Sequence, residues 1–313
     1  MPYASHSALE PAGLQAVHIE RLWWVYFGIS SVIFVLVLGA LALALRRRRR
    51  EMSAQDVQRK RHAVTFFTTA TVVTLLVLLV MSILTGRAIA SLSLDGAVTV
   101  EVSAHRWWWE FRYPVDQGAT RFSTAYEMHI PVGRPIRIKL EAHDVIHSFW
   151  VPNLHGKRDM IPGKTSTLVL RADRPGAYEG QCAEFCGTQH ANMRFLIIAE
   201  SESDFRAWQE RQLAPSVPPD EPQKQRGQTI FLQGTCATCH TIRGTHAFAT
   251  VGPELTHVAS RRRLAMGTLD NDIGHLGGWI SDPQAIKPGV LMPATPLAPD
   301  DFQALLAYLR SLQ

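Results

Sequence analysis

The sequence contains little cysteine, and all of it lies in two short motifs. Only four cysteines occur among 313 residues, as one C-x-x-x-C pair and one C-x-x-C pair. If both pairs bind a cofactor or metal, no cysteine remains for a structural disulfide. The length suggests two or three domains, each long enough to bury a core of its own.

Two long stretches of the chain lack both charge and histidine. Residues 22–45 and 63–86 are apolar runs of 24 residues, and each would form about 36 Å of helix, enough to cross a bilayer core. The apolar region of a secretory signal is much shorter. We therefore expect an N-terminal segment over residues 1–21 and a two-helix transmembrane hairpin over residues 22–86. Without histidines, these helices exclude a haem or catalytic metal held by imidazoles within the membrane.

An excess of basic charge is found in one segment only. The net charge is +5, but residues 46–62 alone contain eight Lys and Arg against two acidic residues. A basic pI that arises from one loop is a poor indication of nucleic-acid binding, so we expect no nucleic-acid partner. The Arg-rich segment lies between two apolar runs. This position predicts a cytoplasmic loop, with both termini on the other side of the membrane.

The pattern changes after the second apolar run. Short alternating segments separated by Pro and Gly turns predict an all-β sandwich or barrel over residues 87–213. The expected strands cover residues 98–103, 111–113, 136–142, 165–171, 176–181 and 195–198. A proline-dense stretch, 214–222, predicts a semi-extended linker. A C-terminal domain follows over residues 223–313, with an amphipathic helix expected at 299–312.

The C-x-x-x-C pair lies among other soft metal ligands. The candidate ligands are His147, Cys182, Cys186, His190, Met193 and the backbone carbonyl of Glu184. Such nitrogen and sulfur donors select copper over harder metals. Two thiolates on one loop can bridge two coppers and share one electron between them. A disulfide is the alternative in an oxidising compartment, but the His and Met at fixed spacing favour copper.

The C-x-x-C pair continues into histidine, as Cys236-Ala237-Thr238-Cys239-His240. Outside the cytoplasm this is the attachment pattern of a c-type haem, with Cys236 and Cys239 forming thioethers and His240 an axial ligand. A thioredoxin-like pair would need a βαβ context, and a zinc site would need a second compact ligand pair. The sequence shows neither, so a covalent haem c is expected.

These motifs carry a family resemblance. H-S-F-W-V-P at residues 147–152 and C-A-E-F-C-G-x-x-H-x-x-M at 182–193 resemble the CuA signature of subunit II of haem–copper cytochrome c oxidases. The whole chain is similar to subunit II of bacterial caa-type oxidases, in which a cytochrome c is fused. The resemblance implies a multi-domain protein: a transmembrane hairpin, a cupredoxin-like Greek-key CuA domain with two coppers, and an all-α class I cytochrome c domain.

The resemblance also implies roles for single residues of the copper domain. Trp107 lies in H-R-W-W-W-E, which resembles the family's aromatic segment, and would carry electrons to the copper centre. For Trp108 and Trp109 we favour simple packing. The side chain of Glu184 is a candidate ligand for Mg or Mn shared with subunit I, since hard ions prefer oxygen donors. Residues 157–159 would face the same subunit, or form a solvated turn.

In the C-terminal domain the resemblance points to the second axial ligand of the haem. Met292 lies in P-G-V-L-M-P, which is similar to the family's ligand loop. Met266 is the competitor, in a context more typical of packing. Pro253 resembles the residue whose carbonyl orients the proximal imidazole, a contact that fixes the tautomer of a ligand.

The function implied is electron input to a terminal respiratory oxidase of the bacterial inner membrane. Electrons from cytochrome c or the bc complex would pass through haem c and CuA to haem a of subunit I, where O₂ is reduced to water; subunit III is a further expected partner. Two alternatives remain open, a CuA-containing nitric oxide reductase subunit and a copper-delivery assembly factor with a thioredoxin-like fold. The thiol pair argues against a quinol oxidase subunit.

Overall fold

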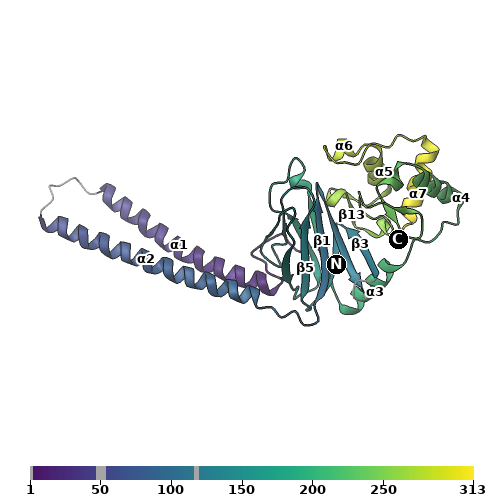
Figure 1. Ribbon diagram of the computed structural model, residues 1–313. Helices are drawn as coiled ribbons and strands as arrows, with labels where there is room; N and C mark the ends of the chain where they lie inside the picture. Colours follow the sequence, from purple (N-terminus) through teal and green to yellow (C-terminus); the bar gives the residue numbers. More distant parts are fainter. Residues whose placement is uncertain (1–2, 47–53, 116–119) are drawn as a thin grey trace. The chain divides into compact units, whose positions relative to one another are not determined.

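A computed structural model describes residues 3–46, 54–115 and 120–313. The chain separates into two compact units, Gln15–Leu92 and a second unit made of Met1–Leu14 and Ser93–Gln313. The first unit contains two long helices, α1 (Leu14–Arg46) and α2 (Ala54–Ala90) (Figure 1). Of the expected Arg-rich loop, residues 47–53 lie outside the described part of the chain.

Both helices are long and apolar enough to cross a membrane. Their most apolar windows have mean hydropathies of 2.6 and 2.4, and 0% and 6% of those windows are buried. Exposed apolar surface on this scale fits a lipid environment better than a soluble core. The Tyr26 hydroxyl donates to the carbonyl oxygen of Leu78, 3.3 Å away, which ties one helix to the other. Both helices extend beyond the expected apolar runs because polar turns continue the helix at their ends.

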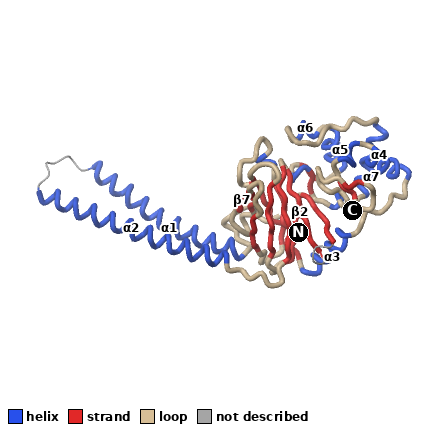
Figure 2. Tube along the Cα trace, in the orientation of Figure 1, coloured by secondary structure: helices blue, strands red, loops and turns tan. Residues whose placement is uncertain are grey.

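The middle of the chain forms two five-stranded sheets, with strand orders β3-β2-β1-β5-β8 and β4-β10-β9-β6-β7 (Figure 2). The strands are β1 (Val98–His105), β2 (Trp108–Val115), β3 (Thr120–Ala125), β4 (Glu127–Pro131), β5 (Ile136–Ala142), β6 (His147–Trp150), β7 (Arg158–Met160), β8 (Ser166–Leu170), β9 (Gly176–Cys182) and β10 (Arg194–Glu200). Strands β1 and β5 pair in parallel, as do β4 and β10, and the other pairs are antiparallel. All six strands expected from the sequence are present.

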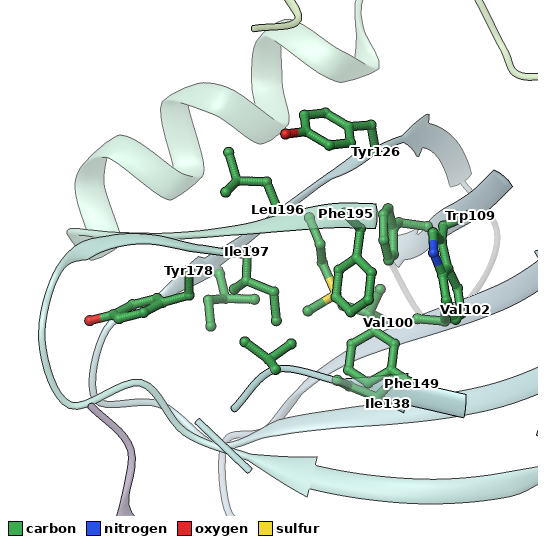
Figure 3. Close-up of a cluster of buried hydrophobic side chains, with 14 of the residues drawn as sticks. Val100, Val102, Trp109, Tyr126, Ile138, Phe149, Tyr178, Phe195, Leu196 and Ile197 are labelled. Carbon is green, nitrogen blue, oxygen red and sulfur yellow. The ribbon is translucent and has the colours of Figure 1, made fainter. Parts of the chain in front are cut away.

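The core of this domain lies between the two sheets. Strand β5 buries every second residue, which is the pattern of a strand with one face on the core. Aromatic side chains fill the interior, and Trp109, Phe149 and Phe195 pack against one another in edge and stacked geometries (Figure 3). Trp109 has no exposed surface, which confirms the expectation that it packs in the core.

A helix closes the β domain before the linker. Helix α3 (Glu202–Leu213) begins with Ser201, whose hydroxyl accepts a hydrogen bond from the amide of Asp204. Its Trp208 stacks on His129, with ring centroids 4.2 Å apart. This packing fixes the end of the β domain from which the linker departs.

The C-terminal domain is helical, as expected. Its helices are α4 (Pro222–Gln233), α5 (Ile273–Ser281), α6 (Pro283–Ile286) and α7 (Pro299–Ser311). Helices α4 and α7 meet at Gly227, where a Cβ would collide with the carbonyl oxygen of Ala304. Two short strand pairs depart from the all-α expectation, β11 (Thr241–Ile242) with β12 (Ala247–Phe248) and β13 (Arg263–Leu264) with β14 (Leu269–Asp270). Each is a two-residue ladder across a tight turn, too short to give an alternating pattern.

The core packing predicts how the β domain responds to truncation. Phe111→Ala removes a fully buried ring and should lower the free energy of unfolding by about 3–5 kcal/mol, the range for large-to-small changes in cores. Phe248→Ala is the matched control, since that ring is 72% exposed; it should cost less than about 0.5 kcal/mol. Chemical denaturation of the detergent-solubilised protein measures both, and equal losses would contradict this packing.

Candidate copper and haem sites

The frame of the first site is made by three neighbouring strands. Strand β6 pairs with β9 so that Phe149 lies opposite Cys182, and β9 pairs with β10 so that Arg194 lies opposite Gln181. This register places His147, at the start of β6, beside the loop that connects β9 and β10. His147 and Cys182, which are 35 positions apart in the sequence, are thus brought to the same end of one sheet.

Backbone hydrogen bonds close the loop between β9 and β10. The amide of Cys182 donates to the carbonyl oxygen of Met193 at 3.0 Å, across the base of the loop. The amide of Ala183 donates to the carbonyl oxygen of Ser148 at 2.9 Å. A short 3₁₀ turn, His190–Asn192, returns the chain toward β10. The loop therefore has a fixed conformation on which side chains converge.

Five side chains and one carbonyl meet inside this loop. The Sγ atoms of Cys182 and Cys186 are 3.8 Å apart, and both cysteines are free thiols. A different histidine lies beside each thiol, with His147 Nδ1 at 3.7 Å from Cys182 Sγ and His190 Nδ1 at 3.6 Å from Cys186 Sγ. Met193 Sδ is 3.8 Å from Cys186 Sγ, and the carbonyl oxygen of Glu184 is 3.2 Å from Cys182 Sγ.

The two thiols are buried, and each affects the ionisation of the other. A hydrogen bond from Cys186, with a further one from His147, holds the pKa of Cys182 well below its usual range. Proximity to Cys182 and burial raise the pKa of Cys186, because a second thiolate beside the first is unfavourable. A bound cation would remove this conflict, since thiolates bind metal in their deprotonated form.

Asp144 orients the first histidine of the site. His147 is fully buried, and its Nε2 lies 2.8 Å from Asp144 Oδ1. The carboxylate also accepts from the amides of Arg106 and Val145. Burial alone would raise the pKa of Asp144, but these hydrogen bonds lower it. With Nε2 held by a carboxylate, Nδ1 is left facing Cys182, which is the arrangement found around metal-ligating histidines.

Two tryptophans border the loop. The Trp107 indole N–H donates to the carbonyl oxygen of Cys186 at 3.0 Å, and the Trp109 indole N–H lies 3.4 Å from the carbonyl oxygen of Met193. Trp108 is half-buried and stacks on the ring of His105 at 4.3 Å. Of the three, Trp107 has the closest hydrogen bond to a thiol-bearing residue.

The carboxylate of Glu184 points away from the thiols. Its side chain is 45% exposed, and its nearest charged partner is the ammonium of Lys157 at 3.5 Å. Lys157 also lies 3.9 Å from Asp159. The carbonyl and the side chain of Glu184 thus face different surroundings, one soft and buried, the other charged and partly solvated.

The second site is a cavity of about 420 Å³ that is lined by the C-terminal domain and by a few residues of the β domain, Trp107 and Tyr126 among them. Cys236, Cys239 and His240 line it, along with Met292. Cys236 lies within a 3₁₀ turn, Thr235–Thr238, and Cys239 directly follows it; the amide of His240 donates to the carbonyl oxygen of Cys236 at 3.0 Å. The motif is therefore folded as one compact turn facing an apolar cavity, as a covalently attached macrocycle requires.

The imidazole of His240 is held by a single contact. Its Nδ1 is 2.7 Å from the carbonyl oxygen of Pro253, so Nδ1 donates and Nε2 is left as a free donor atom for a metal. Burial lowers the pKa of His240, which favours the neutral, ligating form. Gly252 allows this approach, because a Cβ there would be 2.6 Å from His240 Cε1.

Both candidate methionines lie at the cavity, in different surroundings. Met266 is nearly buried and belongs to the hydrophobic cluster of the β domain. Met292 packs at the edge of the cytochrome domain's own cluster. The two methionines thus belong to different hydrophobic clusters, which agrees with the packing role expected for Met266.

Sequence reasoning missed three residues that the structure brings to these sites. Asp144 could have been recognised in the sequence, because it lies three residues before His147, in the segment that leads into β6. Gly252 precedes Pro253 in a motif that was singled out for the proline alone. Lys287 carried no signal; its buried ammonium contacts the carbonyl oxygens of Trp107 and Asn192 at 3.0 and 2.9 Å, and only the tertiary structure reveals this.

Fold and donor sets together define a class. Two apolar helices, a cupredoxin-like β domain with a soft thiol–imidazole–thioether site, and a helical domain with a C-x-x-C-H cavity describe a membrane-anchored fusion of a copper domain with a c-type cytochrome. A family profile described as "Cytochrome C oxidase subunit II, periplasmic domain" matches residues 114–200. A second, described as "Cytochrome c", matches residues 224–313.

Several curated proteins resemble the chain over most of its length. A cytochrome c oxidase subunit 2 from Alkalihalophilus pseudofirmus is 35% identical, over 98% of this chain and 91% of that protein. The subunit 2 proteins of Bacillus sp. (strain PS3) and Bacillus subtilis are 31% and 30% identical, over 79% and 70% of this chain and 73% and 63% of those proteins. The chain belongs to the cytochrome c oxidase subunit 2 family, with a fused cytochrome c domain. It is therefore a component of an oxidoreductase complex with other subunits, and its domains imply copper and haem c.

The contact between Asp144 and His147 gives a prediction. Asp144→Asn replaces the carboxylate that orients the imidazole and should weaken copper binding by about 10–100-fold, the usual effect of losing such a partner. Competition against a copper chelator measures the affinity. Asp95→Asn, which changes an exposed carboxylate bonded to Ser93, is the control. Equal affinities in Asp144→Asn and wild type would refute the orienting role.

Proposed function

We propose that this chain is the electron-input subunit of a terminal respiratory cytochrome c oxidase. When bound, the covalent haem c and the dinuclear CuA centre supply one-electron transfer from an external donor to haem a of subunit I, where O₂ is reduced to water. One observation carries the proposal: Trp107 lines the cavity of the C-x-x-C-H motif and its indole donates to the carbonyl of Cys186. A single side chain thus borders both sites.

The copper ligands we assign are those that converge in the loop between β9 and β10. Cys182 and Cys186, whose sulfur atoms lie 3.8 Å apart, would hold the two coppers as thiolates. His147, His190, Met193 and the carbonyl oxygen of Glu184 would supply the remaining donors. A buried, preformed loop of this kind changes little when charge is added, which favours fast electron exchange.

The haem ligands we assign follow from the lining of the cavity. Cys236 and Cys239 would attach the haem through thioethers, and His240 and Met292 would ligate its iron. The carbonyl of Pro253 keeps the His240 proton on Nδ1, so Nε2 is available to iron. Histidine–methionine ligation raises the haem potential, which suits a protein that accepts electrons from cytochrome c or the bc complex.

Orientation and partners complete the proposal. The positive-inside rule assigns the Arg-rich segment to the cytoplasm of a bacterial cell, so both redox domains would face the periplasmic side of the inner membrane. Subunits I and III are the expected partners within the membrane. The exposed carboxylate of Glu184 is a candidate ligand for Mg or Mn at the boundary with subunit I, where the partner would supply further oxygen donors.

The thiol pair provides the direct test of the copper assignment. Cys186→Ser removes one bridging sulfur, so the protein should lose the delocalised mixed-valence signal in electron paramagnetic resonance. The visible spectrum of haem c should stay unchanged, because the two sites share no ligand. A mixed-valence signal that survives in Cys186→Ser would exclude a thiolate-bridged pair.

Substitutions of the two methionines at the cavity, Met292→Ala and Met266→Ala, form a matched pair that tests which one ligates the haem. Met292→Ala should abolish the visible charge-transfer band of methionine-ligated ferric haem and lower its reduction potential, since thioether ligation favours the ferrous state. Met266→Ala should leave the band in place, because Met266 packs in the cluster of the β domain. The opposite pattern would assign the ligand to Met266.

A further inference from the structure

Lys287 reaches from the cytochrome domain into the copper domain. Its side chain is 1% exposed, and its ammonium donates to the carbonyl oxygens of Trp107 at 3.0 Å and Asn192 at 2.9 Å. An isolated buried ammonium is costly unless hydrogen bonds compensate it. Both acceptors belong to the copper domain, and Asn192 lies on the loop between β9 and β10. A lysine buried this way therefore marks a specific contact between the two domains.

The loop that follows Lys287 covers Trp107. The Gln189 side-chain amide donates to the carbonyl oxygen of Pro288 at 3.0 Å. Gly289 adopts a φ of +91°, and a Cβ there would lie 3.3 Å from the Trp107 ring. A Cβ on Gly187 would lie 2.9 Å from the same ring. Two glycines, one from each domain, thus approach the indole closely, and Trp107 is 7% exposed.

A second contact between the two domains involves the turn between β13 and β14. The turn between β13 and β14 carries Met266 into the hydrophobic cluster of the β domain. Gly267, with a φ of +83°, sits against Tyr126, whose ring would be 2.8 Å from a Cβ. The Glu254 carboxylate accepts from the amide and hydroxyl of Ser123 at 3.3 and 3.2 Å. The cytochrome domain therefore contacts the β domain at a second place besides Lys287.

The first residues of the proline-dense linker are bound to the cytochrome domain. The amide of Ser216 donates to the carbonyl oxygen of Arg243 at 2.9 Å, and the Arg243 guanidinium donates to the carbonyl oxygen of Leu213 at 3.0 Å or less. His257 Nε2 is 3.0 Å from the carbonyl oxygen of Ala214. A slack tether, which would work by raising the effective concentration of a mobile domain, would not make these contacts.

We propose that Lys287 is a docking anchor that keeps the cytochrome domain seated on the copper loop. The chain's own haem domain then occupies the surface around Trp107, so an external cytochrome cannot dock there and must deliver electrons to the haem domain instead. The role of this docking in electron transfer rests on the proposed function. The docking itself depends only on contacts between residues of this chain. Lys287 is a positioning residue, since it contacts backbone carbonyls and no cofactor ligand.

The test measures the accessibility of Trp107 in the full chain within its oxidase complex. Hydroxyl-radical footprinting with mass spectrometry compares wild type, Lys287→Met and Lys139→Met, the last replacing a lysine whose side chain is 48% exposed. Losing the ammonium's hydrogen bonds should raise labelling of Trp107 about tenfold in Lys287→Met, because such bonds are among the stronger ones in proteins. Trp109, buried within the β domain, serves as the internal standard and should stay protected in all three proteins.

A second measurement follows electron exchange in wild type and in Lys287→Met. In wild type, the rate of electron exchange between haem c and copper should be independent of solvent viscosity, since a docked domain does not diffuse; Lys287→Met should make it viscosity-dependent. Equal Trp107 labelling in wild type and Lys287→Met, or a wild-type rate that falls in proportion to viscosity, would overturn the docking proposal. Absence of the copper or haem spectrum in wild type would instead refute the proposed function, and footprinting would still report on docking.

Discussion

Two buried thiols 3.8 Å apart impose the constraint on which the rest of the copper domain depends. They cannot both ionise side by side without a cation, because like charges in a poorly solvated site repel strongly. The three-strand frame of β6, β9 and β10 holds them there, and the bond from the Cys182 amide to the Met193 carbonyl closes the loop. The histidines and the thioether then surround the thiols with neutral donors. The protein thus provides a site where the negative charge of two thiolates is compensated only when metal binds.

The same loop is the point at which the two redox domains meet. Trp107 contacts it through its indole N–H, and Lys287 contacts it through the Asn192 carbonyl. A fused domain could act as a mobile carrier on a flexible linker. The bound linker and the buried lysine describe a fixed carrier instead, in which covalent fusion and docking act together. Fixed docking removes a diffusional search from each transfer, at the cost of closing this surface to other partners.

Much of the site could be predicted because its ligands are local in sequence. Cys182, Cys186, His190 and Met193 lie within twelve residues, and C-x-x-C-H is contiguous, so spacing alone indicated the chemistry. The strand with strict alternation, β5, was predicted to the residue. Strands β6 and β7 were missed because they are only four and three residues long, and β3 because its polar residues give no apolar alternation.

Contacts between distant segments were beyond the reach of pattern reasoning. Lys287 is a lone lysine before Pro-Gly, and nothing nearby distinguishes it from a solvated side chain. Its burial arises only when a loop of the cytochrome domain meets residues 180 and 95 positions earlier. Helix ends were likewise underestimated, since α1 and α2 continue past their apolar runs into polar sequence that a hydropathy criterion does not detect.

Metal and haem analysis of the purified, matured protein tests the central claim most directly. The account predicts two coppers and one covalent haem for each chain, with both thiols of the C-x-x-x-C pair bound to copper. One copper or none in fully matured protein, or a disulfide between Cys182 and Cys186, would contradict it.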